Sequence, residues 1–339
     1  MSFLHEVISE YQQRPSLIRR LFALHIAESL LLPLDVVREI LEITSAEPFL
    51  YVFGGCIGAL PSTASWTFST LTNEWKEIPP LPSERCNFSA LFVKGCVWVL
   101  GGMPSTKSVD IYDPITASWS VGPELLTARW DFGAAVLGVG GVIFLFGGDG
   151  PAGPRSACNF RCGKWSNIAP MKFPKRSASA AVIGEEIYVV GGEKTSGRLS
   201  IEVYSSQTDQ WRQFLPSLEV SPLGVSVFNN SGTLTVLSRH GCVHRLSASK
   251  QPEACRGQKW LKGPAPKKKR SGRSCATQGR IYHLGGVEKD FLDANSCSGG
   301  GILGNDNLPD VEVLWNSVWI DLPPLPRPLR DFALAVSKE

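Results

Sequence analysis

The chain has little net charge and no long apolar run. Its 34 basic and 31 acidic residues leave a formal charge of +3 over 339 residues, which argues against a general nucleic-acid-binding surface. No apolar stretch approaches the roughly 20 residues that a membrane-spanning helix needs. A cationic start followed by an apolar core is also absent, so we expect no secretory signal. We therefore expect neither a membrane nor a specific nucleic acid among its partners.

Paired metal-ligand clusters are also absent from the sequence. Cys158 and Cys162 are four residues apart, as are His240 and His244, but a zinc site needs four ligands and hence a second paired cluster. The nine cysteines are scattered and odd in number. We expect them to be reduced thiols in a cytoplasmic protein, with the nucleus as an alternative compartment.

The motifs of several enzyme classes are missing. The chain contains no G-x-S-x-G nucleophile motif and no phosphate-binding loop. Residues 299–304 match G-x-G-x-x-G, but a dinucleotide site needs a strand before this motif and a helix after it. Neither is indicated, so a flexible loop is the expected structure. We predict that the chain is not an enzyme and holds no metal or other cofactor.

What the chain does contain is an internal repeat, best formed at residues 176–211. An apolar run at 180–183 is followed by a turn, a second apolar run at 187–190 and the pair Gly191-Gly192. A third strand, 201–204, alternates in polarity, and Trp211 follows. Four short strands in one unit form a twisted sheet that needs neighbouring units to bury its faces.

Copies of this unit recur along the chain. Four more glycine pairs follow apolar runs, at Gly54-Gly55, Gly101-Gly102, Gly147-Gly148 and Gly285-Gly286. The successive intervals are 47, 46, 44 and 94 residues, and because 94 is twice 47, one degenerate copy lies between the last two pairs. Tryptophans keep the same spacing, at Trp75, Trp119, Trp165, Trp211, Trp260 and Trp319. We expect the glycines to permit close approach between units, and the tryptophans to be buried between them.

These units resemble the kelch repeat, whose period of about 50 residues builds one four-stranded blade of a β-propeller. The resemblance implies an all-β, six-bladed kelch β-propeller over residues 48–339. The first copy starts at its second strand, 49–53, and a surplus strand at 330–336 matches the opening strand of other copies, such as 129–136. We predict that strand 330–336 completes the first blade, closing the ring and leaving no exposed sheet edge.

Residues 1–47 are different in character and predict a short helical segment. Apolar residues at positions 4, 7, 8 and 11 form a helical stripe. The sequence LPLDVVREIL, residues 32–41, resembles the opening of an F-box, a module that docks ubiquitin-ligase scaffolds. The first blade begins sooner than a full F-box would allow. A helical cap on the propeller and the tail of a longer helical domain are the alternatives.

An arginine precedes the first strand of five of the six copies: Arg85, Arg129, Arg176, Arg273 and Arg330. We expect rotational repetition to place all five on one solvated rim around the central channel. In the BTB–kelch ubiquitin-ligase adaptors that this repeat resembles, arginines at this turn bind acidic peptides, and a serine follows them. Ser177 and Ser274 match that serine, whereas Cys86, Trp130 and Asp331 depart from it, which implies a different peptide. Guanidinium groups suit carboxylates, although capping of loop carbonyls is an alternative role.

The sequence thus predicts a protein–protein interaction module that binds a protein partner, with an acidic segment favoured, through its loop rim. The predicted contact residues are Arg85, Arg129, Trp130, Arg176, Ser177, Arg273, Ser274 and Arg330. One alternative is a substrate-recognition adaptor of a ubiquitin ligase, docked through residues 1–47. A kelch-fold enzyme is the other. The basic run 266–270 resembles a nuclear import signal or adds positive field to the rim.

Overall fold

The structure, a computed structural model, describes most of the chain from residue 48 onwards. The described residues are 48–58, 60–104, 107–192, 199–214, 218, 225–230, 232–238, 243–247, 260–267, 272–286 and 308–337. The predicted helical segment and the F-box resemblance at 1–47, and the glycine-rich stretch at 299–304, lie outside them. Within these described ranges, no helix has the length and apolarity needed to cross a membrane.

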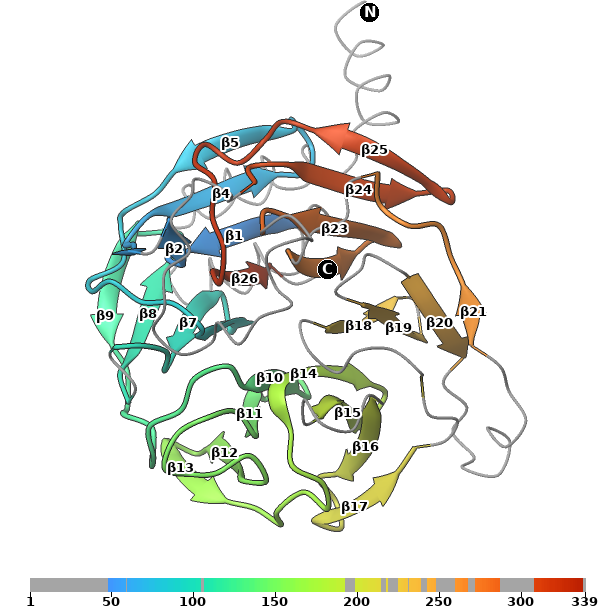
Figure 1. Ribbon diagram of the computed structural model, residues 1–339. Coiled ribbons are helices and arrows are strands. Elements are labelled where there is room, and N and C mark those ends of the chain that lie inside the picture. The colour runs from blue at the N-terminus through green and yellow to red at the C-terminus, as the bar shows by residue number, and fades with distance from the viewer. Residues whose placement is uncertain are drawn as a thin grey trace, which may run out of the picture.

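Six four-stranded antiparallel sheets surround a central channel, as Figure 1 shows. Blades 1 to 3, each from its innermost strand outwards, consist of β26 (Ala333–Val336), β1 (Phe49–Phe53), β4 (Ser65–Ser69) and β5 (Glu74–Glu77); β6 (Ser89–Val93), β7 (Cys96–Leu100), β8 (Val109–Asp113) and β9 (Ser118–Val121); and β10 (Gly133–Leu137), β11 (Val142–Phe146), β12 (Ala157–Arg161) and β13 (Lys164–Asn167).

Blades 4 to 6 consist of β14 (Arg176–Ile183), β15 (Glu186–Gly192), β16 (Ser200–Ser205) and β17 (Gln210–Gln213); β18 (Ser226–Asn230), β19 (Thr233–Leu237), β20 (Val243–Ser247) and β21 (Leu261–Lys262); and β22 (Arg273–Thr277), β23 (Arg280–Leu284), β24 (Val311–Trp315) and β25 (Val318–Leu322). A small hairpin, β2 (Cys56–Ile57) with β3 (Leu60–Pro61), follows β1. The prediction of an all-β, six-bladed propeller is confirmed.

The ring is closed in blade 1, where strands from the two ends of the described chain pair. β26 lies antiparallel to β1, with Leu50 opposite Val336 and Phe53 opposite Ala333. The blue and red strands lie side by side in Figure 1. Because β26 occupies the inner edge of blade 1, the backbone of β1 is hydrogen-bonded on both sides, to β26 and to β4.

The apolar core lies between the blades. Each of six clusters of buried side chains draws on two neighbouring blades, and together they cover all six blade boundaries. Indole N–H groups tie the same boundaries: Trp119 Nε1 donates to the Pro79 carbonyl at 3.1 Å, and Trp165 Nε1 donates to the Pro123 carbonyl at 3.0 Å. Trp165 is buried between blades as predicted and Trp119 is partly buried, and both side chains connect successive blades.

The glycine pairs stand where the second strand of one blade meets the turn that enters the next blade. Gly101 has φ +61°, and a Cβ there would lie 2.7 Å from the carbonyl oxygen of Arg129. The N–H of Gly102 donates to that same carbonyl at 3.0 Å. Both the backbone conformation and the close approach therefore require glycine, as the sequence predicted.

Candidate binding face around the channel mouth

Two sets of loops share one end of the propeller. Because the strands of each blade are antiparallel, the loop between second and third strands lies at the same end as the turn into the next blade. We call this end the entry face. Its described parts include residues from 54–64, 78–88, 101–108, 122–132, 147–156, 168–178, 263–267, 285–286, 308–310 and 323–332. All the predicted contact residues precede or begin an inner strand, so their exact register decides which of them reach this face.

The backbone gives that register directly. The N–H of the second glycine in a pair donates to the carbonyl of one residue in the turn that enters the next blade. These acceptor residues, which we call the turn position, are Arg85, Arg129, Lys175 and Leu329.

The five predicted arginines therefore do not occupy one repeat position, and that prediction is wrong. Arg176 and Arg330 stand one residue after the turn position. Arg273 begins the inner strand β22 and pairs with Leu284, as Ser89 at the start of β6 pairs with Leu100. It thus lies four residues further along the repeat than Arg85.

Arg85 is fully buried, so the expectation of a solvated rim is wrong for this residue. Its guanidinium forms an ion pair with Asp110 on β8 and donates to Ser83 Oγ at 2.8 Å. Burial lowers the pKa of Arg85, and the Asp110 carboxylate opposes that effect. The side chain therefore joins the turn to the third strand of blade 2, and the capping alternative describes it better than partner contact.

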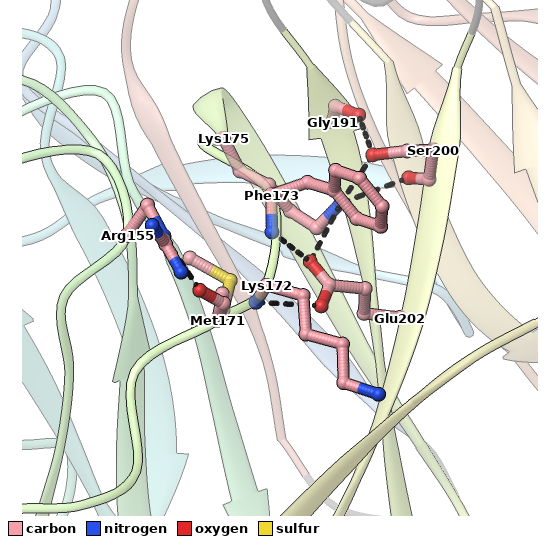
Figure 2. Close-up of polar contacts among 8 residues, drawn as sticks. All are labelled: Arg155, Met171, Lys172, Phe173, Lys175, Gly191, Ser200 and Glu202. Carbon is pink, nitrogen blue, oxygen red and sulfur yellow. Dashed lines mark hydrogen bonds and ion pairs between the residues drawn. The ribbon is translucent and has the colours of Figure 1, made fainter.

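Lys175 takes the turn position in blade 4 and makes the corresponding pair with Glu202 on β16. The ammonium lies 3.5 Å from the carboxylate, and both side chains are 0% exposed. Lys175 Nζ also donates to Ser200 Oγ at 2.6 Å, while Glu202 accepts from the backbone N–H groups of Lys172 and Phe173 at 2.8 and 3.2 Å (Figure 2). Burial lowers the pKa of Lys175 to about 8 although Glu202 opposes this shift. Lys175 was missed in the sequence because an arginine was sought in each turn and the adjacent Arg176 was found.

Arg129 takes the turn position in blade 3, but no carboxylate among the described residues pairs with it. Cys158 pairs with Leu145 as Asp110 pairs with Val99, so a thiol stands where blade 2 has an aspartate. Arg129 is 2% exposed, and its Nε and Nη1 have no hydrogen-bond partner among the described residues. Burial lowers its pKa and raises that of Cys158. The expected solvation is wrong for Arg129 as well.

The remaining predicted residues reach the solvent or line the channel. Arg176 is 52% exposed and forms a 2.9 Å ion pair with Asp149. Arg330 is partly exposed, and its Nε donates to the Gly58 carbonyl at 3.2 Å. Trp130 is half-buried in the same row, one residue after Arg129. These three positions form the accessible part of the predicted set on the entry face.

A second row of residues surrounds the channel mouth. Asn87, Asp131, Ser177 and Asp331 each stand two residues after the turn position, with φ between +47° and +56°. Backbone N–H groups of Asn87 and Asp131 donate to the carbonyls of Asp331 and Asn87 at 3.0 and 2.8 Å. Ser177 Oγ donates to an Asp131 carboxylate oxygen at 2.5 Å. These contacts link the turns of four blades around the mouth.

The surroundings of this second row shift the pKa of one of its carboxyl groups, that of Asp331. Desolvation by the surrounding atoms and the like charge of Asp131 raise the pKa of Asp331, while Arg273 and Arg330 oppose that effect. The carboxylates and guanidinium groups of the mouth thus lie close enough to influence one another, which gives this end of the channel a mixed charge.

Behind the mouth, the inner strands enclose a channel of about 500 Å³. Small residues such as Ala90, Gly133 and Ala180 line much of it, and Arg273 and Ser274 line the blade 6 side. Ser274 Oγ is hydrogen-bonded to His283 Nδ1 at 2.8 Å. Ser274 is therefore a channel residue, in a different repeat position from Ser177.

Comparison with known proteins identifies the repeat. The model of the kelch motif matches residues 84–126 and 174–214, which span blades 2 and 4 with their entry turns. The chain is a kelch-repeat β-propeller. The predicted resemblance is confirmed.

Curated relatives of this kelch propeller include Kelch-like protein 23 from Homo sapiens, 28% identical over 200 residues that cover 55% of this chain and 34% of that protein. Kelch-like protein 25 from Xenopus tropicalis is 30% identical, covering 49% of this chain and 30% of that protein. Kelch repeat protein M-T8 from Myxoma virus is 26% identical, covering 48% and 33%. The chain thus spans about a third of the length of the relatives it matches.

Metal-ligating side chains do not gather in the described part of the kelch propeller. Across the described ranges, no group of three or more histidine, cysteine, aspartate or glutamate side chains is placed to hold a metal ion. The features that the kelch propeller offers to another molecule are its entry face, with exposed cations and apolar side chains, and the channel behind it.

Proposed function

We propose that the chain is a protein-interaction module that binds a partner protein across its entry face. The observation that carries the proposal is a set of exposed apolar side chains on turns of that face from different blades. Leu60 on the hairpin of blade 1 is 74% exposed, Leu126 on the turn into blade 3 is 42% exposed, and Phe173 on the turn into blade 4 is 41% exposed. Exposed apolar residues beside polar loops are typical of binding surfaces.

The charges around the mouth support a proposal for the chemistry of the partner. Arg176, Arg273 and Arg330 supply the cations that an acidic segment would contact, because Arg85 and Arg129 are buried. Asp131 and Asp331 lie among them. The partner surface that fits this pattern combines carboxylates with hydrogen-bond donors and carries an apolar side chain. Trp130, Ser177 and Ser274 remain part of the proposed contact set.

The test begins with a partner screen that uses the full chain as bait, in cytoplasmic and nuclear extracts. Each partner is then purified, and its affinity is measured for wild type, Phe173→Ser and Arg176→Ala. Matched controls change exposed residues away from the entry face: Val139→Ser in the turn between β10 and β11, and Lys164→Ala on β13. We expect the entry-face changes to weaken binding at least tenfold and the controls to leave it unchanged. Equal effects of both sets would overturn the proposal.

Two further arms separate the alternative functions. Deletion of residues 1–47 should abolish association with a ubiquitin-ligase scaffold if the chain is an adaptor, and should leave entry-face binding intact. For the enzyme alternative, elemental analysis of the purified protein decides: we expect no stoichiometric metal. One copper, iron or zinc ion per chain would favour an enzyme.

A further inference from the structure

Side chains that follow a glycine pair meet side chains of the next blade's turn. Between blades 3 and 4, the N–H of Gly148 donates to the carbonyl of Lys175 at 2.9 Å. The next residue on each side is Asp149 and Arg176, and their side chains form the 2.9 Å ion pair described above. The backbone contact therefore brings these two side chains into direct contact across the blade boundary.

The same relationship between blades 1 and 2 places two cysteines together. The N–H of Gly55 donates to the carbonyl of Arg85 at 2.9 Å. The next residue on each side is Cys56 and Cys86, so the two thiols occupy the positions that Asp149 and Arg176 occupy further round the ring. The two thiols are hydrogen-bonded to each other, and both are buried and reduced.

The surroundings make the two thiols unequal. The hydrogen bond from Cys56 lowers the pKa of Cys86, and the charge of Arg330 acts in the same direction, against burial and Asp331. The pKa of Cys56 is raised by the same hydrogen bond and by burial. Cys86 is therefore the thiol that more readily carries the negative charge, and the thiolate is the nucleophilic form of cysteine.

We propose that Cys56 and Cys86 are a modification site, at which hydrogen peroxide oxidises them to a disulfide across the boundary between blades 1 and 2. The Cys86 thiolate attacks the peroxide, the O–O bond breaks, and a sulfenic acid and one water form. The Cys56 sulfur then attacks the Cys86 sulfur, and the hydroxyl leaves as a second water. Two thiols lose one electron each, and hydrogen peroxide is reduced to two waters.

The disulfide would act on the entry face itself. Cys56 and Arg330 exchange two backbone hydrogen bonds, with N–O distances of 2.8 and 3.2 Å. A covalent bond from Cys56 to Cys86 therefore fixes the hairpin of blade 1, which is hydrogen-bonded to Arg330, to the turn into blade 2. This effect rests on the proposed function, whereas the oxidation itself does not.

The test treats the purified full chain with one equivalent of hydrogen peroxide, blocks the remaining thiols under denaturing conditions, and maps the peptides by mass spectrometry. Trypsin releases Cys56 in the segment 39–76 and Cys86 in the segment 86–94. We expect these two segments joined, with the mass of two hydrogens lost, and both cysteines protected from alkylation. Exposed Cys162 provides the comparison within the same molecule.

Serine variants test whether the sulfurs of Cys56 and Cys86 form the disulfide. Cys86→Ser and Cys56→Ser should each reduce the joined peptide to background, and Cys162→Ser should leave its yield unchanged. If Cys56 and Cys86 stay alkylatable while Cys162 is oxidised, or if either cysteine pairs with another one, the proposal is overturned. Should a serine variant fail to fold, the wild-type peptide map decides. Binding measured on the oxidised protein reports separately on the entry face.

Discussion

Arg129 and Cys158 occupy in blade 3 the positions that Arg85 and Asp110 occupy in blade 2. The cation is present in both blades, but only blade 2 supplies the carboxylate. A buried charge without a counter-charge weakens a fold, because its desolvation is not offset by Coulomb attraction. Blade 3 therefore contains a site at which stability can be gained by a single substitution.

Replacing Cys158 by aspartate should stabilise the protein. The new carboxylate would face Arg129 and accept a charge-assisted hydrogen bond, raising the free energy of unfolding by about 2 kcal/mol. Urea unfolding of wild type and Cys158→Asp measures the change. In an Arg129→Met background the same aspartate has no cation to meet and should destabilise. A destabilising effect of equal size in both backgrounds would show that the two side chains do not interact.

Removing the carboxylate in blade 2 should have the opposite effect. Asp110→Asn leaves the buried Arg85 without its counter-charge and should lower the free energy of unfolding by about 3 kcal/mol. The matched control is Glu186→Gln, which breaks the partly exposed pair with Arg212 and should cost less than about 1 kcal/mol. Equal losses in the two variants would contradict a special role for the buried pair.

Because the pKa of buried Lys175 is lowered, we expect the folded protein to become more stable at alkaline pH. The pKa of Lys175 falls from the ordinary 10.5 to about 8 in the folded protein, so the unfolded chain binds this proton more tightly. Below pH 8 the buried charge weakens the fold, and this penalty disappears as pH rises from 8 to 10.5. The gap corresponds to about 3 kcal/mol. Wild-type stability relative to Lys175→Met should increase across that window, and a constant difference would rule out the depressed pKa.

Because β26 closes the ring, we expect the folded protein to require it. Deleting residues 330–339 removes β26, which exposes the inner edge of β1 and the apolar side chains packed on both sides of blade 1. We expect loss of soluble monomer in size-exclusion chromatography. Removing only residues 338–339, which follow β26, is the control. An unchanged melting temperature of the larger deletion would contradict closure through β26.

The spacing of the glycine pairs and tryptophans predicted the blades well because it reflects requirements of the backbone. Glycine pairs are fixed by close approach of backbones, as at Gly101, so they recur even where other residues vary. Matching arginines by type misplaced three of the five, because the turn position tolerates lysine and leucine. Counting ten residues from each tryptophan would have found it: Trp75 leads to Arg85, and Trp165 leads to Lys175.

Burial of the turn arginines could not be predicted in this way. Whether Arg85 points into the blade depends on Asp110, which lies 25 residues away and becomes its neighbour only when β8 packs in blade 2. Arg129 is buried without any such partner, so its sequence surroundings give no sign of its position. The contact between Cys56 and Cys86 likewise depends on a backbone hydrogen bond between two blades.

The pairing of β1 with β26 also sets an order of events during synthesis. Phe53 and its partner Ala333 are separated by 280 residues. At bacterial or eukaryotic translation rates of about 5–20 residues per second, β26 follows β1 by roughly 15 to 60 s. Throughout that interval, blade 1 has an open inner edge while the later blades assemble beside it. The inner edge of β1 therefore stays without its native partner until β26 leaves the ribosome.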